Sequence, residues 1–220
     1  MHTFTTIYCD FDGTISKQDS VNSFFSKYAL PEWQQIEMSW QQNKITSKEC
    51  LIKQLELVRG VDEHVLDSYL NSIELDEYFL EFYSYLLKTG RKLVILSDGF
   101  EFFIRKILQN HGIYNYECYS NTLEFDGEKF RVSFKNHNPR CEYGAGTCKC
   151  LKVNENKFVY IGDGLSDICI GQKASILYAK NSLRKYCDSI GINYRKFATF
   201  YDVLADLRKG DINATANSTN

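Results

Sequence analysis

Short apolar runs recur along this chain, and segments with helical periodicity separate them. We expect strands at residues 5–9, 92–97, 158–162 and 175–179, with an edge strand at 197–200. Between two of these runs, Glu101–Asn110 is amphipathic with the period of a helix, and His111-Gly112 ends it. Strands that alternate with helices predict the α/β class, here a Rossmann-like parallel sheet flanked by helices.

Two segments depart from this alternation. Residues 16–88 are helix-rich and aromatic, and Pro31 interrupts them near the start, which predicts a helical module inserted between the first and second core strands. Glu117–Phe134 alternates around Asp126-Gly127 and predicts a β-hairpin. The predicted units are an α/β core at 1–15 and 89–208, a helical domain at 16–88 and a disordered polar tail at 209–220.

Composition and charge narrow the class of protein. The chain has 220 residues, of which 44% are hydrophobic and 25% charged, enough for one sizeable core with an inserted module. A formal net charge of −2 gives no footprint for nucleic acid or a membrane surface. The sequence has no long apolar run and opens directly into the first strand, so we expect neither a membrane helix nor a signal peptide. We expect a cytoplasmic protein, and nothing in the sequence fixes its oligomeric state.

The cysteines leave one question open. Eight cysteines without a regular spacing suit free thiols in a reducing compartment. Cys141, Cys148 and Cys150 lie close together in the sequence, with His137 just upstream. These residue types bind zinc, although their spacing matches no standard Cys-x-x-Cys pair, so both a metal site and plain thiols stay possible.

The first candidate for chemistry is the segment Asp10-Phe11-Asp12-Gly13-Thr14, directly after the first apolar run. Ligands of open α/β sheets bind at the carboxyl ends of strands, where this segment is expected. Two carboxylates there can divide the work, since one can attack and the other can transfer protons. A solvated turn is the simpler alternative, and a calcium loop would need further oxygen ligands.

Two more strand ends carry polar groups. Ser97-Asp98-Gly99 follows the second run, and its hydroxyl and backbone N–H groups could bind phosphate or simply cap a helix. The next run ends at Gly162-Asp163-Gly164-Leu165-Ser166-Asp167. Asp163 and Asp167 with Asp10 would form an oxygen-only site that suits Mg²⁺, although Asp167 alone could balance a helix dipole. Lys149 lies between these segments and could hold phosphate charge.

Together, the motifs at Asp10–Thr14, Leu96–Gly99, Lys149 and Gly162–Asp167 resemble the four ordered motifs of the haloacid dehalogenase-like (HAD) superfamily. The resemblance spans roughly residues 5–200. It implies that Asp10 is a nucleophile that forms an aspartyl-phosphate and that Asp12 is the general acid and base. An acid at that second position is typical of the phosphatases and phosphomutases of the superfamily, whereas its dehalogenases lack it.

The same resemblance implies the remaining roles. Ser97, with Asp98 and Gly99, would bind the transferring phosphoryl group, and Lys149 would steady it. Mg²⁺ would be held by Asp10, the backbone carbonyl of Asp12, and Asp163. Asp167 would bind the ion through water or orient the site.

The helical insertion resembles the small cap of the phosphoserine phosphatase-like branch. That branch grips its amino acid with a Glu after the first motif and an Arg in the cap. Asp19 stands at the first place, and Lys53 or Gln54 at the second, which argues against phosphoserine because neither replaces a bidentate guanidinium.

Several short segments instead resemble the MtnX-type phosphatases of methionine salvage, which act on 2-hydroxy-3-keto-5-methylthiopentenyl-1-phosphate. They are Pro31-Glu32-Trp33, Ser47-Lys48-Glu49, Phe102-Phe103 and Gly146-Thr147-Cys148-Lys149. The expected function is therefore Mg²⁺-dependent hydrolysis of a small phosphorylated metabolite. Phosphoserine, phosphoethanolamine and phosphocholine stay alternatives, as do a phosphotransferase or mutase and a non-catalytic ligand-binding protein.

Overall fold

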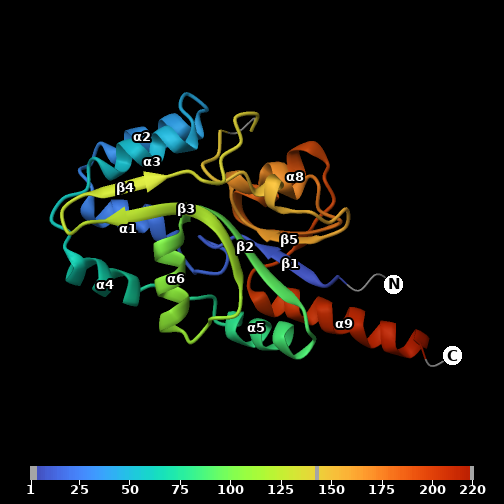
Figure 1. Cartoon of the computed structure of the whole chain (residues 1–220). Coiled ribbons are helices and arrows are strands. Elements are labelled where there is room, and N and C mark those ends of the chain that lie inside the picture. The colour runs from blue at the N-terminus through green and yellow to red at the C-terminus, as the bar shows by residue number, and fades with distance from the viewer. Residues whose placement is uncertain (1–3, 142–143, 219–220) are drawn as a thin grey trace.

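A seven-stranded sheet forms the centre of the computed structural model, which describes residues 4–141 and 144–218, with residues 211–218 described by their backbone alone (Figure 1). The strand order is β4-β3-β2-β1-β5-β6-β7, and every neighbouring pair is parallel except β3 with β4. The strands are β1 (Thr6–Cys9), β2 (Lys92–Phe100), β3 (Glu117–Phe125), β4 (Phe130–Ser133), β5 (Val159–Gly162), β6 (Ile176–Ala179) and β7 (Arg195–Lys196).

Alternating side chains of the central strands fill two separate hydrophobic layers. Ile7 and Ile95 belong to the larger layer, whereas their chain neighbours Tyr8 and Val94 belong to the smaller one on the other face. A strand that is buried on both faces reads as a continuous apolar run, which is why these segments stand out in the sequence. The helices of the second half are α6 (Glu101–Asn110), α7 (Ile168–Gly171), α8 (Asn181–Ile190) and α9 (Phe200–Ser218), with 3-10 helices η1 (Lys149–Lys152) and η2 (Leu165–Asp167).

Five helices lie between β1 and β2 in the chain. They are α1 (Ser20–Tyr28), α2 (Trp33–Gln41), α3 (Ser47–Leu55), α4 (Glu63–Asn71) and α5 (Phe79–Lys88). Local signals fix their starts: Asp19 caps α1, and Thr46 with Glu49 forms a capping box on α3. Phe79 of α5 packs edge-on against Phe200 of α9, and Phe82 packs against the same ring at a tilt, while α5 also contacts β2.

The β3-β4 hairpin extends the sheet toward the first helices. Its strands pair antiparallel from Thr122 with Ser133 to Phe125 with Phe130, as the sequence predicts. β4 contacts α3, and Phe130 packs edge-on against Phe24 of α1. In Figure 1 the hairpin, α2 and α3 gather above the carboxyl ends of β1 and β2.

The predicted α/β class and parallel sheet are confirmed, and α6 has the predicted bounds. The predicted edge strand at 197–200 is wrong: the strand is Arg195–Lys196, and Phe197 and Phe200 are buried instead, because their rings pack under the sheet. α9 continues to Ser218, so the backbone stays helical where the sequence predicts a disordered tail from residue 209; that stretch contains no proline to stop the helix. In the described part of the chain, no helix has the length and apolar character needed to cross a membrane.

Candidate active site

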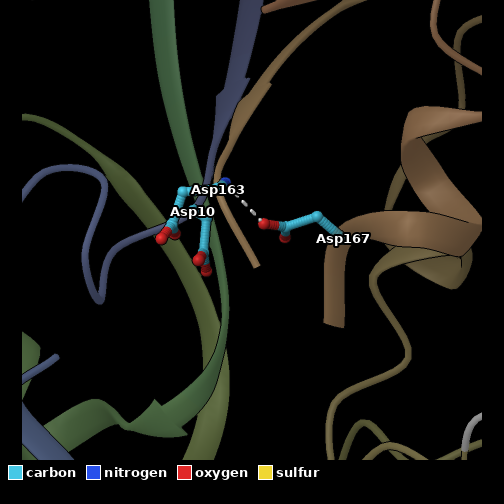
Figure 2. A group of neighbouring side chains, drawn as sticks. All are labelled: Asp10, Asp163 and Asp167. Carbon is cyan, nitrogen blue, oxygen red and sulfur yellow. Dashed lines mark hydrogen bonds between the residues drawn. The ribbon is translucent and has the colours of Figure 1, made fainter. Parts of the chain in front are cut away.

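Three carboxylates meet at the carboxyl edge of the sheet (Figure 2). Asp10 follows the last residue of β1, Asp163 follows β5, and Asp167 ends η2. One oxygen from each lies within 4.8 Å of the others. Asp10 and Asp163 point the same way in Figure 2, whereas Asp167 approaches from the side and accepts a hydrogen bond from the Asp163 backbone N–H at 2.9 Å. The fold therefore brings Asp10 together with Asp163 and Asp167, which belong to a motif far from it in the sequence.

Asp167 is fully buried and its carboxylate has four donors. Lys149 Nζ and the Tyr160 hydroxyl both donate to Oδ1 at 2.5 Å. The backbone N–H groups of Asp163 and Gly164 both donate to Oδ2 at 2.9 Å. These bonds occupy the lone pairs that a metal ion would need, so the geometry favours an orienting role for Asp167.

Lys149 is the cation at the centre of this cluster. Its ammonium lies 2.8 Å from Asp10 Oδ1 and also donates to Ser166 Oγ at 3.2 Å. Burial lowers the pKa of Lys149, but the charges of Asp10 and Asp167 outweigh that effect and raise it above its usual range. Lys149 therefore stays charged.

The donor set fits a hard divalent cation. Burial, and then the charge of Asp167, raise the pKa values of both Asp10 and Asp163. Thr14 Oγ1 and Asn181 Nδ2 hold Asp163 from two sides, at 2.9 and 3.0 Å. A buried oxygen-only cluster with more negative than positive charge is the environment that Mg²⁺ occupies in proteins. Asp10 and Asp163 are therefore the side chains suited to hold it.

Asp12 forms no ion pair within the described part of the chain, and its carboxylate is held by hydroxyl and backbone N–H groups. Ser20 donates to Oδ1 twice, from its backbone N–H at 2.8 Å and its hydroxyl at 2.5 Å, and Ser97 Oγ lies 3.4 Å from Oδ2. Burial raises the pKa of Asp12, and the Ser20 bonds offset this in part. A Cβ at Gly99 would strike Asp12 Oδ2, so glycine is required there. A carboxyl with a raised pKa suits proton transfer.

Two neighbouring polar residues near the carboxyl end of β2, Ser97 and Asp98, have different partners. Ser97 is buried, and its hydroxyl accepts from the Gly99 backbone N–H at 2.9 Å. The Asp98 carboxylate joins three segments: it accepts from the Thr147 backbone N–H at 2.8 Å, from Asn121 Nδ2 at 3.1 Å, and from the Ser47 hydroxyl of α3. Asp98 thus ties the loop before Lys149, and α3, to the end of β2.

A cavity of about 330 Å³ opens above these carboxylates and extends to α1, α2 and α3. Asp19 and Gln54, two of the sequence-predicted specificity residues, line it. Asp19 also accepts from the backbone N–H groups of Val21 and Asn22 at the start of α1. Lys53 is exposed and is not among the lining residues, so the helix turns Gln54 inward and Lys53 outward.

The cysteine-rich segment holds free thiols in this structure. His137 Nδ1 lies 3.1 Å from the Ala145 carbonyl oxygen, and Cys150 Sγ lies 2.8 Å from Cys169 Sγ, a residue outside the predicted group. Within residues 4–141 and 144–218, the convergent set of three or more potential metal ligands is Asp10, Asp163 and Asp167. His137, Cys141, Cys148 and Cys150 therefore do not converge as a zinc site.

Several side chains of the site were not predicted from the sequence. Tyr160 sits inside a predicted strand, and Ser20 at the start of a predicted helix, so nothing in the pattern marks either as polar contacts of a site. Asn181 begins α8, two residues after the end of β6, and its φ of 47° is unusual for a residue other than glycine. A polar residue at the carboxyl end of another parallel strand is the signal that could have found it.

A sequence profile described as haloacid dehalogenase-like hydrolase matches residues 7–172, more than half of the chain. The chain belongs to the haloacid dehalogenase-like hydrolase family. Among curated relatives, the 2-hydroxy-3-keto-5-methylthiopentenyl-1-phosphate phosphatase of Geobacillus thermodenitrificans is 27% identical over 94% of this chain and 96% of its own length. The enzyme of that name from Brevibacillus brevis is 28% identical over 92% and 95%. The resemblance to HAD phosphatases of MtnX type is confirmed.

Solved structures agree on the fold. A substrate-bound phosphoserine phosphatase superposes with a TM-score of 0.68 at 20% identity, covering 93% of this chain and 99% of that one. A phospho-aspartyl intermediate analogue of phosphoserine phosphatase gives 0.66 at 18% identity, covering 90% and 95%. At these identities the likeness concerns the fold alone.

Proposed function

We propose that this hydrolase is a Mg²⁺-dependent phosphatase that releases inorganic phosphate from a small phosphorylated metabolite through an aspartyl-phosphate. The observation that carries the proposal is an ion pair of 2.8 Å between Asp10, on the floor of the cavity, and Lys149 beneath that floor, with Asp12 two residues further on. Phosphoryl transfer depends mainly on positioning and charge neutralisation, and this floor supplies both.

The two half-reactions follow from these positions. In the first, an oxygen of Asp10 attacks phosphorus, the bond from phosphorus to the leaving oxygen breaks, and protonated Asp12 gives that oxygen its proton. In the second, Asp12 takes a proton from water, the water oxygen bonds to phosphorus, and the bond to Asp10 breaks. Lys149 and the Ser97 hydroxyl hold the phosphoryl oxygens, while Asp167 fixes Lys149.

Mg²⁺ held by Asp10, Asp163 and the Asp12 backbone carbonyl would supply positive charge next to the transferring group. Thr14 and Asn181 keep Asp163 oriented for that purpose. We place Asp167 as the residue that orients Lys149, because its own oxygens are already taken by four donors.

Helices α1, α2 and α3 would act as the cap over this floor, within the module at residues 16–88. The favoured substrate is the methionine-salvage intermediate 2-hydroxy-3-keto-5-methylthiopentenyl-1-phosphate, which the relatives' names give as theirs. Phosphoserine fits less well, since Gln54 occupies the inward position on α3 and supplies no guanidinium. Phosphoethanolamine and phosphocholine are alternative substrates, and the experiment below includes both.

The test is phosphate release from a panel that contains these four compounds and p-nitrophenyl phosphate, with Mg²⁺ and with excess chelator. We expect Mg²⁺-dependent release without any added acceptor, fastest for the methionine-salvage intermediate. Transfer to an added alcohol with little free phosphate would indicate a phosphotransferase. Folded protein that releases no phosphate from any panel member would contradict the proposal.

A further inference from the structure

The part of the cavity lined by α2 carries a negative charge. Glu37 of α2 lines the cavity and is half-buried. Its Oε2 accepts from Gln54 Nε2 at 3.1 Å and from the Cys50 thiol at 3.7 Å, and its Oε1 accepts from Gln41 Nε2 at 3.1 Å. These neutral donors fix the carboxylate in place without cancelling its charge.

Charge along the cavity is unevenly distributed. Asp19 lies between the two ends: burial, then the charge of Asp12, and also that of Glu37 raise its pKa. Among the described residues that line the cavity, Lys17 is the only cationic side chain, and it pairs with Glu74 at 2.8 Å while half of it faces solvent. Lys149 lies beneath the floor, held by Asp10 and Asp167. The part of the cavity around Glu37, which we call the wall, therefore keeps a net negative charge even when a cation neutralises the carboxylates of the floor.

Apolar side chains flank this carboxylate. Trp40, one turn along α2 from Glu37, lines the cavity together with Cys50 and Leu51 of α3. A leaving group in this space meets one fixed acceptor beside a hydrophobic surface. A hydroxyl or amine can donate to that acceptor, whereas a carboxylate would meet like charge in a partly dehydrated site.

We propose that Glu37 determines leaving-group specificity, accepting a hydrogen bond from a hydroxyl or amine of the substrate and rejecting substrates that carry a carboxylate there. The inference rests on the proposed phosphatase function and adds to it a criterion for which leaving groups are accepted. The substrate class is a phosphomonoester of a neutral or cationic alcohol with a donor close to an apolar portion.

Two substrate pairs isolate the carboxylate. Glycerol 3-phosphate differs from 3-phosphoglycerate in having an alcohol in place of a carboxylate, and phosphoethanolamine differs from phosphoserine in lacking one. For each pair we would measure the ratio of kcat/KM values with wild-type protein, with Glu37→Gln, and with Glu32→Gln. Glu32 is exposed at the start of the same helix and does not line the cavity, so its substitution changes net charge equally.

We expect the wild type to prefer the member without the carboxylate in both pairs, and Glu37→Gln to reduce that preference about tenfold, mainly through KM. Tenfold corresponds to about 1.4 kcal/mol. Glu32→Gln should leave both ratios within about twofold. Thermal unfolding of all three proteins would show that each is folded.

Each result decides a separate claim. Ratios that Glu37→Gln leaves unchanged would overturn the specificity rule while leaving the phosphatase proposal intact. An equal fall with Glu32→Gln would also overturn it, because net charge alone would then explain the effect. A folded wild type that releases no phosphate even from p-nitrophenyl phosphate would overturn the phosphatase proposal and this inference together.

Discussion

The floor and the wall of the cavity are built differently. Beneath the floor and in contact with it, the side chains of Lys149 and Asp167 are 3% and 0% exposed, and each makes several charged hydrogen bonds. On the wall, Glu37 and Trp40 are half-buried, and Glu37 has only neutral partners. Fixed, dry charges suit one reaction, whereas a looser wall can change with few consequences for the fold. The difference teaches that chemistry and substrate choice are separable in this protein.

Asp10→Asn, on the floor of the cavity, is the variant for which we expect the largest effect. The amide is a poor nucleophile, so we expect phosphate release to fall by about 10⁴-fold or more. The same variant should still bind substrate at the wall, which a displacement assay with the preferred panel member would measure. Activity within tenfold of wild type would remove Asp10 from the mechanism.

Lys149→Met tests whether the floor depends on its buried cation. The change leaves Asp10 and Asp167 without their shared partner, and removing one member of a buried ion pair costs about 3–5 kcal/mol. Urea unfolding in excess chelator would measure this loss. Lys53→Met on the exposed face of α3 is the matched control, with an expected change within about 0.5 kcal/mol. Equal losses in both variants would show that the floor is no more interdependent than the surface.

These two lysines also show how far the sequence could lead. Asp10 and Asp163 could be predicted because each directly follows an apolar run, and parallel strands bring such ends together. Lys149 follows no such run, and only the resemblance to the ordered HAD motifs marks it in the sequence. Lys53 and Gln54 are neighbours on a helix, and only the helix's rotation decides which one faces the cavity. The pattern around them does not fix that rotation, so the sequence left both as candidates.

The residues of the wall were harder to predict from the sequence for the same reason. Glu37 and Trp40 lie on an amphipathic helix whose charged residues read as a solvated face, and their role depends on how α2 packs against α3. Phe197 gives the reverse case. Its short apolar run looks like a strand, but the ring is buried against Phe200 and the strand ends before it. Tertiary packing overrides local pattern in both places.

Asp19 lies where floor and wall meet, and its ionisation sharpens the comparison. Burial and the charge of Asp12 raise its pKa from 3.8 to about 8. Folding therefore favours the protonated form, and the stability that this form contributes is lost as the pH rises toward and through 8. Asp19→Asn keeps a good helix cap but cannot ionise. Relative to wild type in chelator, its free energy of unfolding should improve between pH 5 and pH 9 by at least about 1.4 kcal/mol, one pKa unit.

The control for that measurement is Asp62→Asn. Asp62 caps α4 through the Val65 backbone N–H at 2.8 Å and is exposed, so it reproduces the change of cap without the buried site. The two variants should diverge as the pH rises. Parallel curves would mean that Asp19 ionises without penalty and belongs electrostatically to the outer wall.

We expect the smallest effect from removing one hydrogen bond, which joins α3 to the end of β2. Ser47 is buried and donates to the Asp98 carboxylate, which keeps its bonds from Thr147 and Asn121 when the hydroxyl is removed. Ser47→Ala should therefore lower the free energy of unfolding by about 1 kcal/mol.

The same variant should raise KM across the panel by a few-fold with little change in kcat, because the wall is then held less firmly over an unaltered floor. Ser39→Ala is the control, since the Ser39 hydroxyl donates to the Gln35 carbonyl of the same helix at 2.8 Å. If Ser47→Ala instead lowered kcat and left KM unchanged, Asp98 would be transmitting the loss to Lys149 through Thr147. The wall would then help to position the floor, and the two regions would not be separable.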